Sequence, residues 1–298
     1  MRRILCIAAA GAAALAAAGG APAAPASDAA RWTVTPSSQR ELWQGAGALV
    51  ASADAFPPSR AALLRASGFR WVALWLHHGR ARARTNDAAL AAGWVDAFRA
   101  SGLKVCGWGW ADAQPRRDAA LVAELVARHE LDCWIVDAEN PYMAGAYGGR
   151  VERSALFVRE FRARFPHLPA AVTTYGAAIA PWVLPFDYAP WRDHNFALLP
   201  QAYLSVAGYL GPQYVVDHAV RAGYPANRVH PMLGIGWRQQ RRAHRAGDYV
   251  WRLRAAGTRG FSVFLGERAT DADFELLGDA IRRHGLARPP LAAAPGDG

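Results

Sequence analysis

The sequence is poor in lysine and cysteine, and it lacks the usual signatures of nucleotide and metal sites. Lys104 is the single lysine, so the formal charge of +10 at pH 7 comes almost wholly from arginine. The cysteines show neither a C-x-x-C spacing nor a His/Cys cluster, so structural zinc is not indicated. Neither G-x-G-x-x-G nor a P-loop follows an early strand. We therefore expect no cofactor and no bound metal.

Apolar runs long enough to cross a membrane are also missing. Residues 4–18 are apolar but too short to span a bilayer comfortably. Met1-Arg2-Arg3 precedes this run and the small-residue stretch GGAPAAPA follows it, as in a secretory signal peptide. We predict a signal peptide over residues 1–26, and hence a secreted or periplasmic protein with no membrane contact after cleavage. The alternative is a retained N-terminal anchor.

Two arginine clusters, residues 80–84 and 238–242, hold part of the positive charge. Neither belongs to a nucleic-acid-binding motif, so we expect solvated surface and no nucleic-acid partner. The overall charge would favour an anionic partner such as a cell-wall polymer. We expect the chain to be a monomer.

Short apolar runs alternate with amphipathic helical patterns along the chain. The expected strands are 42–51, 70–76, 104–110, 133–137, 171–175, 197–203, 229–235 and 260–265. The clearest helical patterns are 87–100, 118–129, 151–165, 213–222, 243–256 and 271–284. Several helical patterns end in a glycine that suits a left-handed C-cap, namely Gly68, Gly102, Gly223 and Gly257.

This alternation predicts parallel βαβ units in one α/β domain, residues 32–288. Eight such units in about 250 residues match a (β/α)8 TIM barrel, with a doubly wound open sheet as the alternative. Residues 177–195 are proline-rich and aromatic, so we expect an irregular loop there with at most a short helix. Residues 289–298 form an expected disordered tail. Cys106 and Cys133 start neighbouring strands, and they form either a disulfide or a buried free pair.

Polar and aromatic side chains gather where the expected strands end, which is where TIM barrels keep their active sites. Asp137 and Glu139 are two residues apart, so strand alternation places both carboxylates on one face. Two close carboxylates push their pKa values apart and supply the acid and the stabiliser or nucleophile that glycosidic cleavage needs. Indole faces stack on sugar rings. The other candidates for glycan binding are His78, Trp108, Trp110, Asp112, Tyr175, Gln201, Tyr203, Trp237 and Glu267.

The D-x-E at Asp137 and Glu139 resembles the motif of secreted TIM-barrel glycosidases of the family 25 lysozyme and family 18 chitinase types. The resemblance implies that Glu139 is the general acid. It implies that Asp137 orients or stabilises an N-acetyl group or the charge that develops during cleavage. Tyr203 matches a tyrosine at the end of the sixth strand in both families. In the longer family 18 pattern, D-x-x-D-x-D-x-E, Ile135 stands at the second aspartate.

Three functions are compatible with these residues. The first is a secreted glycoside hydrolase cleaving an N-acetylated or related cell-wall-type polysaccharide, with Glu139 as acid and Asp137 as stabiliser or nucleophile. The second is a non-catalytic, glycosidase-like carbohydrate-binding protein. The third is a metal-dependent deacetylase or hydrolase using His77 or His78. The structural alternative is that the two acids cap the next helix or pair with an arginine such as Arg150.

Overall fold

The computed structural model describes residues 41–79, 83–144, 149–175, 185–203, 211–235, 246–266 and 269–286. All of them belong to one compact unit, Val34–Gly298. The expected signal peptide and C-terminal tail lie outside the described residues, so both stay predictions. Within the described part of the chain, no helix has the length and apolar character needed to cross a membrane.

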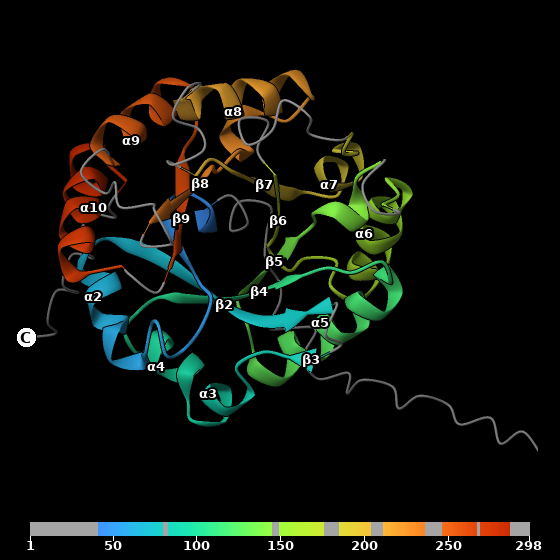
Figure 1. The fold of residues 1–298 in the computed structure, drawn as a ribbon, viewed down its shortest axis with the longest axis horizontal. Helices are drawn as coiled ribbons and strands as arrows, with labels where there is room; N and C mark the ends of the chain where they lie inside the picture. Colours follow the sequence, from blue (N-terminus) through green and yellow to red (C-terminus); the bar gives the residue numbers. More distant parts are fainter. Residues whose placement is uncertain are drawn as a thin grey trace, which may run out of the picture. The chain divides into compact units, whose positions relative to one another are not determined.

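A closed sheet of parallel strands forms the centre of this unit, and helices surround it (Figure 1). Its strands are β1 (Gly45–Val50), β2 (Phe69–His78), β4 (Lys104–Trp110), β5 (Cys133–Asp137), β6 (Ala170–Tyr175), β7 (Phe196–Gln201), β8 (Met232–Ile235) and β9 (Gly260–Leu265). Strand β1 pairs with both β2 and β9, which closes the sheet. The predicted (β/α)8 barrel is confirmed, and closure excludes the open-sheet alternative. A short strand, β3 (Ala83–Arg84), adds to the end of β2 in the antiparallel direction.

The helices alternate with the strands as the sequence predicts. They are α2 (Ala61–Ala66), α3 (Asp87–Ala91), α4 (Trp94–Ala100), α5 (Pro115–His129), α6 (Glu152–Arg164), α7 (Ala189–Asp193), α8 (Gly211–Arg221), α9 (Ala246–Ala255) and α10 (Asp271–Arg283). The four glycines expected at helix ends all have left-handed backbones, with φ of 88°, 78°, 90° and 88° in chain order. The helix expected over 87–100 is instead two helices, because Gly93 also adopts a left-handed backbone at φ 82°.

Side chains from alternate strand positions fill the barrel interior. The buried members of this core are Trp43, Leu49, Trp71, Ala73, Cys106, Trp108, Cys133, Ile135, Ala171, Ala197, Leu199 and Met232. Strand β1 begins at Gly45, later than expected, and Trp43 before it packs edge-on against Trp71 with ring centroids 5.2 Å apart. A side chain at Gly47 would run into the Trp71 indole, so glycine there gives this ring its space.

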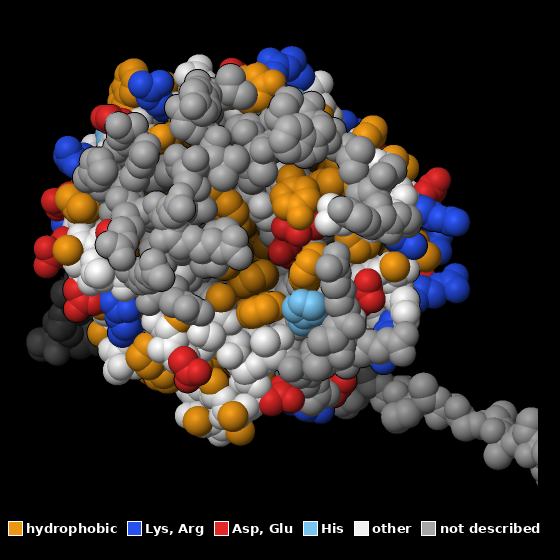
Figure 2. Space-filling view, in the orientation of Figure 1, with side chains coloured by type: hydrophobic (Ala, Val, Ile, Leu, Met, Phe, Trp, Pro, Cys, Tyr) orange, Lys and Arg blue, Asp and Glu red, His pale blue; other side chains and the backbone are white. Residues whose placement is uncertain are grey.

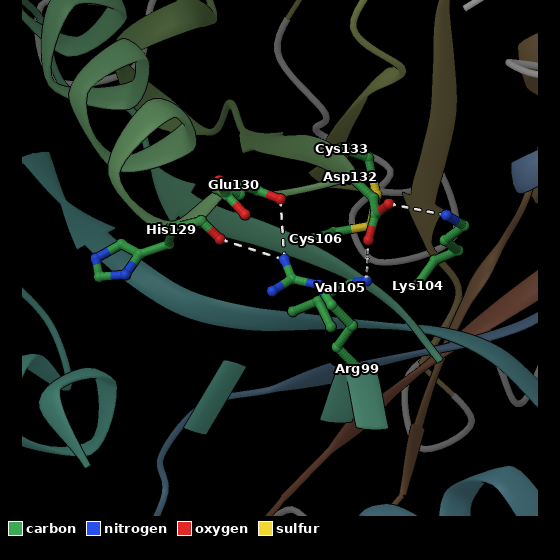
Figure 3. A network of polar contacts seen from close by, with 8 residues as sticks. All are labelled: Arg99, Lys104, Val105, Cys106, His129, Glu130, Asp132 and Cys133. Carbon is green, nitrogen blue, oxygen red and sulfur yellow. Dashed lines mark hydrogen bonds and ion pairs between the residues drawn. A yellow bond between two sulfur atoms is a disulfide. The ribbon is translucent and has the colours of Figure 1, made fainter. Parts of the chain in front are cut away.

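Cys106 and Cys133 form a disulfide between the neighbouring strands β4 and β5, inside the barrel (Figure 3). The two residues are register partners in β4 and β5, with Cα atoms 4.5 Å apart, and both are fully buried. Asp132, just before β5, accepts hydrogen bonds from the Val105 amide at 2.9 Å and from Lys104 Nζ at 3.0 Å. The disulfide and this carboxylate therefore both tie β5 to the start of β4.

We predict that the disulfide stabilises the barrel by roughly 3 kcal/mol, as expected for closing a loop of this length in the unfolded chain. Urea unfolding with a phosphine reductant present should show a midpoint lowered to match. The Cys106→Ala/Cys133→Ala variant should be less stable than the wild type, and the reductant should not change its midpoint. A wild-type urea midpoint that is the same with and without the reductant would contradict the prediction.

Candidate active site

Strand β5 carries the two acids to one end of the barrel. Ile135 belongs to the interior core, so alternation turns Asp137, two residues later, to the same face. Glu139 follows directly after the strand, where a short 3-10 helix, η4 (Asn140–Tyr142), begins. The Glu139 side chain makes no capping hydrogen bond to η4, and Arg150 forms no ion pair with either described acid. Neither a cap at η4 nor a pair with Arg150 is thus seen among the described residues.

Glu139 is held by side chains from the next two strands. Tyr175, at the end of β6, donates its phenol hydrogen to Glu139 Oε2 at 2.8 Å. Gln201, at the end of β7, donates from Nε2 to Glu139 Oε1 at 2.9 Å. Tyr175 and Gln201 are register partners, so the two donors stand side by side. The structure thus brings together three residues that the sequence predicted as parts of one site.

The environment of Asp137 disfavours its ionised form. Burial, and then the charge of Glu139, raise the pKa of Asp137 well above its ordinary value. Asp137 Oδ1 is buried and has no hydrogen-bond partner among the described residues. Burial, followed by the charges of Asp137 and Glu139, also raises the pKa of Tyr203 well above its usual range. Tyr203 therefore lies near both acids and keeps its phenol proton, so it can donate a hydrogen bond.

The rings of Trp75, His78 and Trp110 form an aromatic wall on the β2 and β4 side of the site. A β-bulge between Trp75 and His77 shifts the register of β2, so that His78 pairs with Trp110. The His78 and Trp110 rings meet edge-to-face at 5.1 Å, and His78 is 5.7 Å from the Trp75 ring. Figure 2 shows a central hollow with hydrophobic side chains, acidic atoms and a histidine along it. The bulge thus turns His78 toward the site.

Trp108 lies beneath this wall. Its indole stacks on Trp75 at 5.4 Å and 14°, its Nε1 donates to the Val50 carbonyl at 3.1 Å, and it is only 7% exposed. Trp75 is half-buried, so it presents more of its ring than Trp108 does. Sequence reasoning missed Trp75 because the strand was expected to end at Leu76. Its two-residue spacing from the interior residue Ala73 is the signal that could have found it.

The bulge turns His77 outward, toward helix α5. Asp118 Oδ1 lies 3.3 Å from His77 Nε2, but the geometry leaves both ring nitrogens without a hydrogen bond. Asp118 Oδ2 accepts the Asp112 amide at 2.7 Å. His77, Asp112 and Asp118 line a cavity of about 290 Å³ whose described lining includes neither Asp137 nor Glu139. Asp112 is therefore placed beside α5, apart from the acid pair.

Two predicted site residues, Trp237 and Glu267, lie outside the described residues. Residues 177–184 of the segment expected to be irregular lie outside them as well, and the short helix α7 lies in the described remainder. Among the residues that the structure does describe, no three histidine, cysteine, aspartate or glutamate side chains converge as metal ligands would.

Comparison with known proteins shows similarity of fold. No protein-family model and no curated protein matches this sequence. The C-terminal domain of a Desulfitobacterium hafniense protein described as a chitinase superposes with a TM-score of 0.63 at 10% identity, covering 81% of this chain and 99% of that one. A family 18 chitinase from Cycas revoluta, in complex with (GlcNAc)3, gives 0.60 at 10% identity, with 78% and 99% covered. A chitinase-like agglutinin from Robinia pseudoacacia gives 0.59 at 11% identity, with 78% and 99% covered.

The barrel is thus similar in fold to those of chitinases and a chitinase-like agglutinin, in agreement with the resemblance found in the D-x-E motif. At this level of identity the match concerns the fold alone. The case for an activity has to come from the side chains at the barrel mouth.

We predict that Asp137→Asn stabilises the protein at neutral pH. A raised pKa means that folded Asp137 keeps its proton after the unfolded chain has lost it near pH 4. Stability should therefore fall as the pH rises from about 4 through the folded-state pKa, and the Asn variant should escape this loss. Urea unfolding from pH 4 to 8 measures the effect, with the exposed Asp217→Asn as control. The prediction would be contradicted by an Asn variant that is less stable than the wild type at pH 7. It would also be contradicted if the difference in free energy of unfolding between the two proteins did not decrease toward pH 4.

Proposed function

We propose that the protein is a glycoside hydrolase that cleaves an N-acetylated or related polysaccharide. The observation that carries the proposal is the Glu139 carboxyl, held by Tyr175 and Gln201 beside Asp137 at the C-terminal ends of the strands. Acids in this position of a barrel are typical of catalysis rather than of stability. The fold shared with a chitinase that binds (GlcNAc)3 supports the choice of substrate class.

In the proposed mechanism Glu139 is the general acid. Protonated Glu139 gives its proton to the glycosidic oxygen as the bond from that oxygen to the anomeric carbon breaks. Asp137, ionised at that moment, acts as stabiliser of the positive charge that develops on the sugar or as nucleophile. A water molecule then supplies the hydroxyl group of the new sugar end, and its remaining proton returns to Glu139. The protein ends the cycle in its starting protonation state.

Neighbouring side chains have supporting roles in this proposal. Tyr203 keeps its phenol proton and can donate to the substrate near the two acids. Trp75, His78 and Trp110 form an apolar face on which a sugar ring can stack. Gln201 and Tyr175 fix the orientation of the Glu139 carboxyl. We further propose that the chain is exported, and the buried disulfide is in keeping with an oxidising compartment.

A carbohydrate-binding protein without hydrolysis is the second candidate. The specific observation in its favour is that an agglutinin shares the fold to the same degree as the chitinases do. The two candidates make the same prediction for glycan binding and opposite predictions for turnover.

We predict that Glu139→Gln abolishes hydrolysis while retaining glycan binding. The amide keeps the shape of the side chain but has no acidic proton, so the rate should fall at least about a hundredfold. Hydrolysis of chito-oligosaccharides and of peptidoglycan fragments measures turnover, and calorimetry measures binding. Glu275→Gln, on the exposed side of α10, is the matched control. Unchanged turnover in Glu139→Gln would remove Glu139 from the acid role, and a wild type that binds without turnover would favour the second candidate.

We predict that Trp75→Ala weakens glycan binding roughly tenfold, since one stacked aromatic ring contributes free energy of that order. Calorimetric titration with a soluble chito-oligosaccharide measures the change, and a thermal melt shows that the barrel stays folded. Trp251→Ala is the matched control, because this indole is 59% exposed on the outer helix α9. Equal affinities for both variants would place the glycan elsewhere.

A further inference from the structure

Asp137 lies in a row of side chains that face the barrel interior. Strand register pairs it with Trp110 on β4 and with Thr173 on β6. Ala171 and Tyr175, two residues to either side of Thr173, both face inward, so alternation turns Thr173 inward as well. Paired positions on neighbouring strands lie about 5 Å apart. The Thr173 hydroxyl is therefore within reach of the Asp137 carboxyl.

Both side chains of this pair hold a buried polar atom that lacks a partner. Asp137 Oδ1 and Thr173 Oγ1 make no hydrogen bond to any of the described residues, and Thr173 is only 1% exposed. Buried polar atoms are nearly always hydrogen-bonded, because leaving them unpaired costs free energy. The two atoms do not bond each other in this structure, but a threonine hydroxyl can donate and a carboxyl oxygen can accept, so a change in a side-chain torsion would suffice to pair them. The two unpaired atoms can thus satisfy each other.

Few of the described groups around Asp137 can stabilise its charge, and the Tyr203 phenol is one of them. The inward position beneath Asp137 is Ile135, an apolar side chain. Among the described residues, the titratable groups that act on Asp137 or that it acts on are Glu139 and Tyr203, and Tyr175 lies near Tyr203. On the β4 side stands Trp110, with His78 beyond it. Among the described cations, no arginine or lysine forms an ion pair with Asp137. A hydroxyl donor next to Asp137 therefore has a large influence on its charge state.

The charge state of Asp137 bears on the proposed function. If Asp137 and Glu139 share one proton, Glu139 can act as an acid only when the proton lies on it and Asp137 is ionised. Burial works against this arrangement, since it raises the pKa of Asp137. A hydrogen bond donated to the ionised carboxyl works in its favour.

Building on the proposed hydrolase, we propose that Thr173 is a positioning residue whose hydroxyl donates to ionised Asp137 and so directs the shared proton to Glu139. The proton passes from Asp137 to Glu139, then to the glycosidic oxygen, and water replaces it after cleavage. Thr173 itself keeps its own proton throughout and does not touch the reacting bond.

The test replaces the hydroxyl while keeping the shape, with Thr173→Val. Carbon-13 NMR of labelled aspartate carboxyls follows the ionisation of Asp137, whose signal is identified by its absence in Asp137→Asn. We expect Asp137 to ionise at a pH about one unit higher in the valine variant, because the ionised form has lost a donor. The rate of chito-oligosaccharide hydrolysis at neutral pH should fall about tenfold, with the acid limb of the pH profile displaced upward. Thr173→Ser should restore both properties.

Thr174→Val is the matched control. Thr174 follows on the same strand, is fully buried, has an equally unpaired Oγ1, and faces outward by alternation. It should leave the titration of Asp137 unchanged. Equal changes in both valine variants, or no change in Thr173→Val, would overturn the proposal. If only Trp110→Phe changes the pH at which Asp137 ionises, the donor is the Trp110 indole, which would also overturn the proposal. If no glycan is hydrolysed even by the wild type, the hydrolase proposal fails separately, because the NMR titration still tests the contact between Thr173 and Asp137.

Discussion

The strict alternation of side chains across a closed barrel wall is the constraint on which the rest of the structure depends. Because Ile135 faces the core, Asp137, two residues later on the same strand, also faces the barrel interior. The same rule sets Thr173 and Tyr175 inward on β6 and Gln201 inward on β7. Because neighbouring strands are in fixed register, these inward residues form rows, and each row places chemically different side chains next to one another.

A β-bulge in β2 interrupts this alternation beside the candidate site. The bulge in β2 adds one residue between Trp75 and His77, so the alternation of inward and outward side chains is offset after it. His77 therefore faces the helices, and His78 faces the barrel interior. His78 joins the aromatic wall, while His77 approaches Asp118 on α5. A side chain at Gly109, the register partner of His77, would collide with the histidine, so the bulge and this glycine depend on each other.

The sequence predicts the barrel and its acid pair well, for physical reasons. Strands β4, β5 and β9 have the predicted bounds because the apolar run of β4 begins after Lys104, that of β5 ends at Asp137, and that of β9 lies between Gly260 and Gly266. The pairing of Tyr175 and Gln201 with Glu139 could be anticipated only as nearness, since hydrogen bonds depend on side-chain torsions. The bulge has no mark within β2, and the link to Gly109 on β4 appears only once the register is known, so the opposite orientations of His77 and His78 were not predictable. The site of Asp112 beside α5 depends on the same feature and on the loop that follows β4.

The disulfide has a consequence for how the protein is made. Both sulfur atoms belong to fully buried residues in the barrel core, beneath the layer that holds Trp108 and Ile135. Thiol–disulfide exchange requires an attacking thiolate to reach the sulfur, and both cysteines are 0% exposed in a closely packed interior. The bond must therefore form while β4 and β5 are still open to an oxidant, before the remaining strands close around them. Oxidation is thus a step in the assembly of the barrel, and a chain that closes first would keep its two thiols locked in the reduced state.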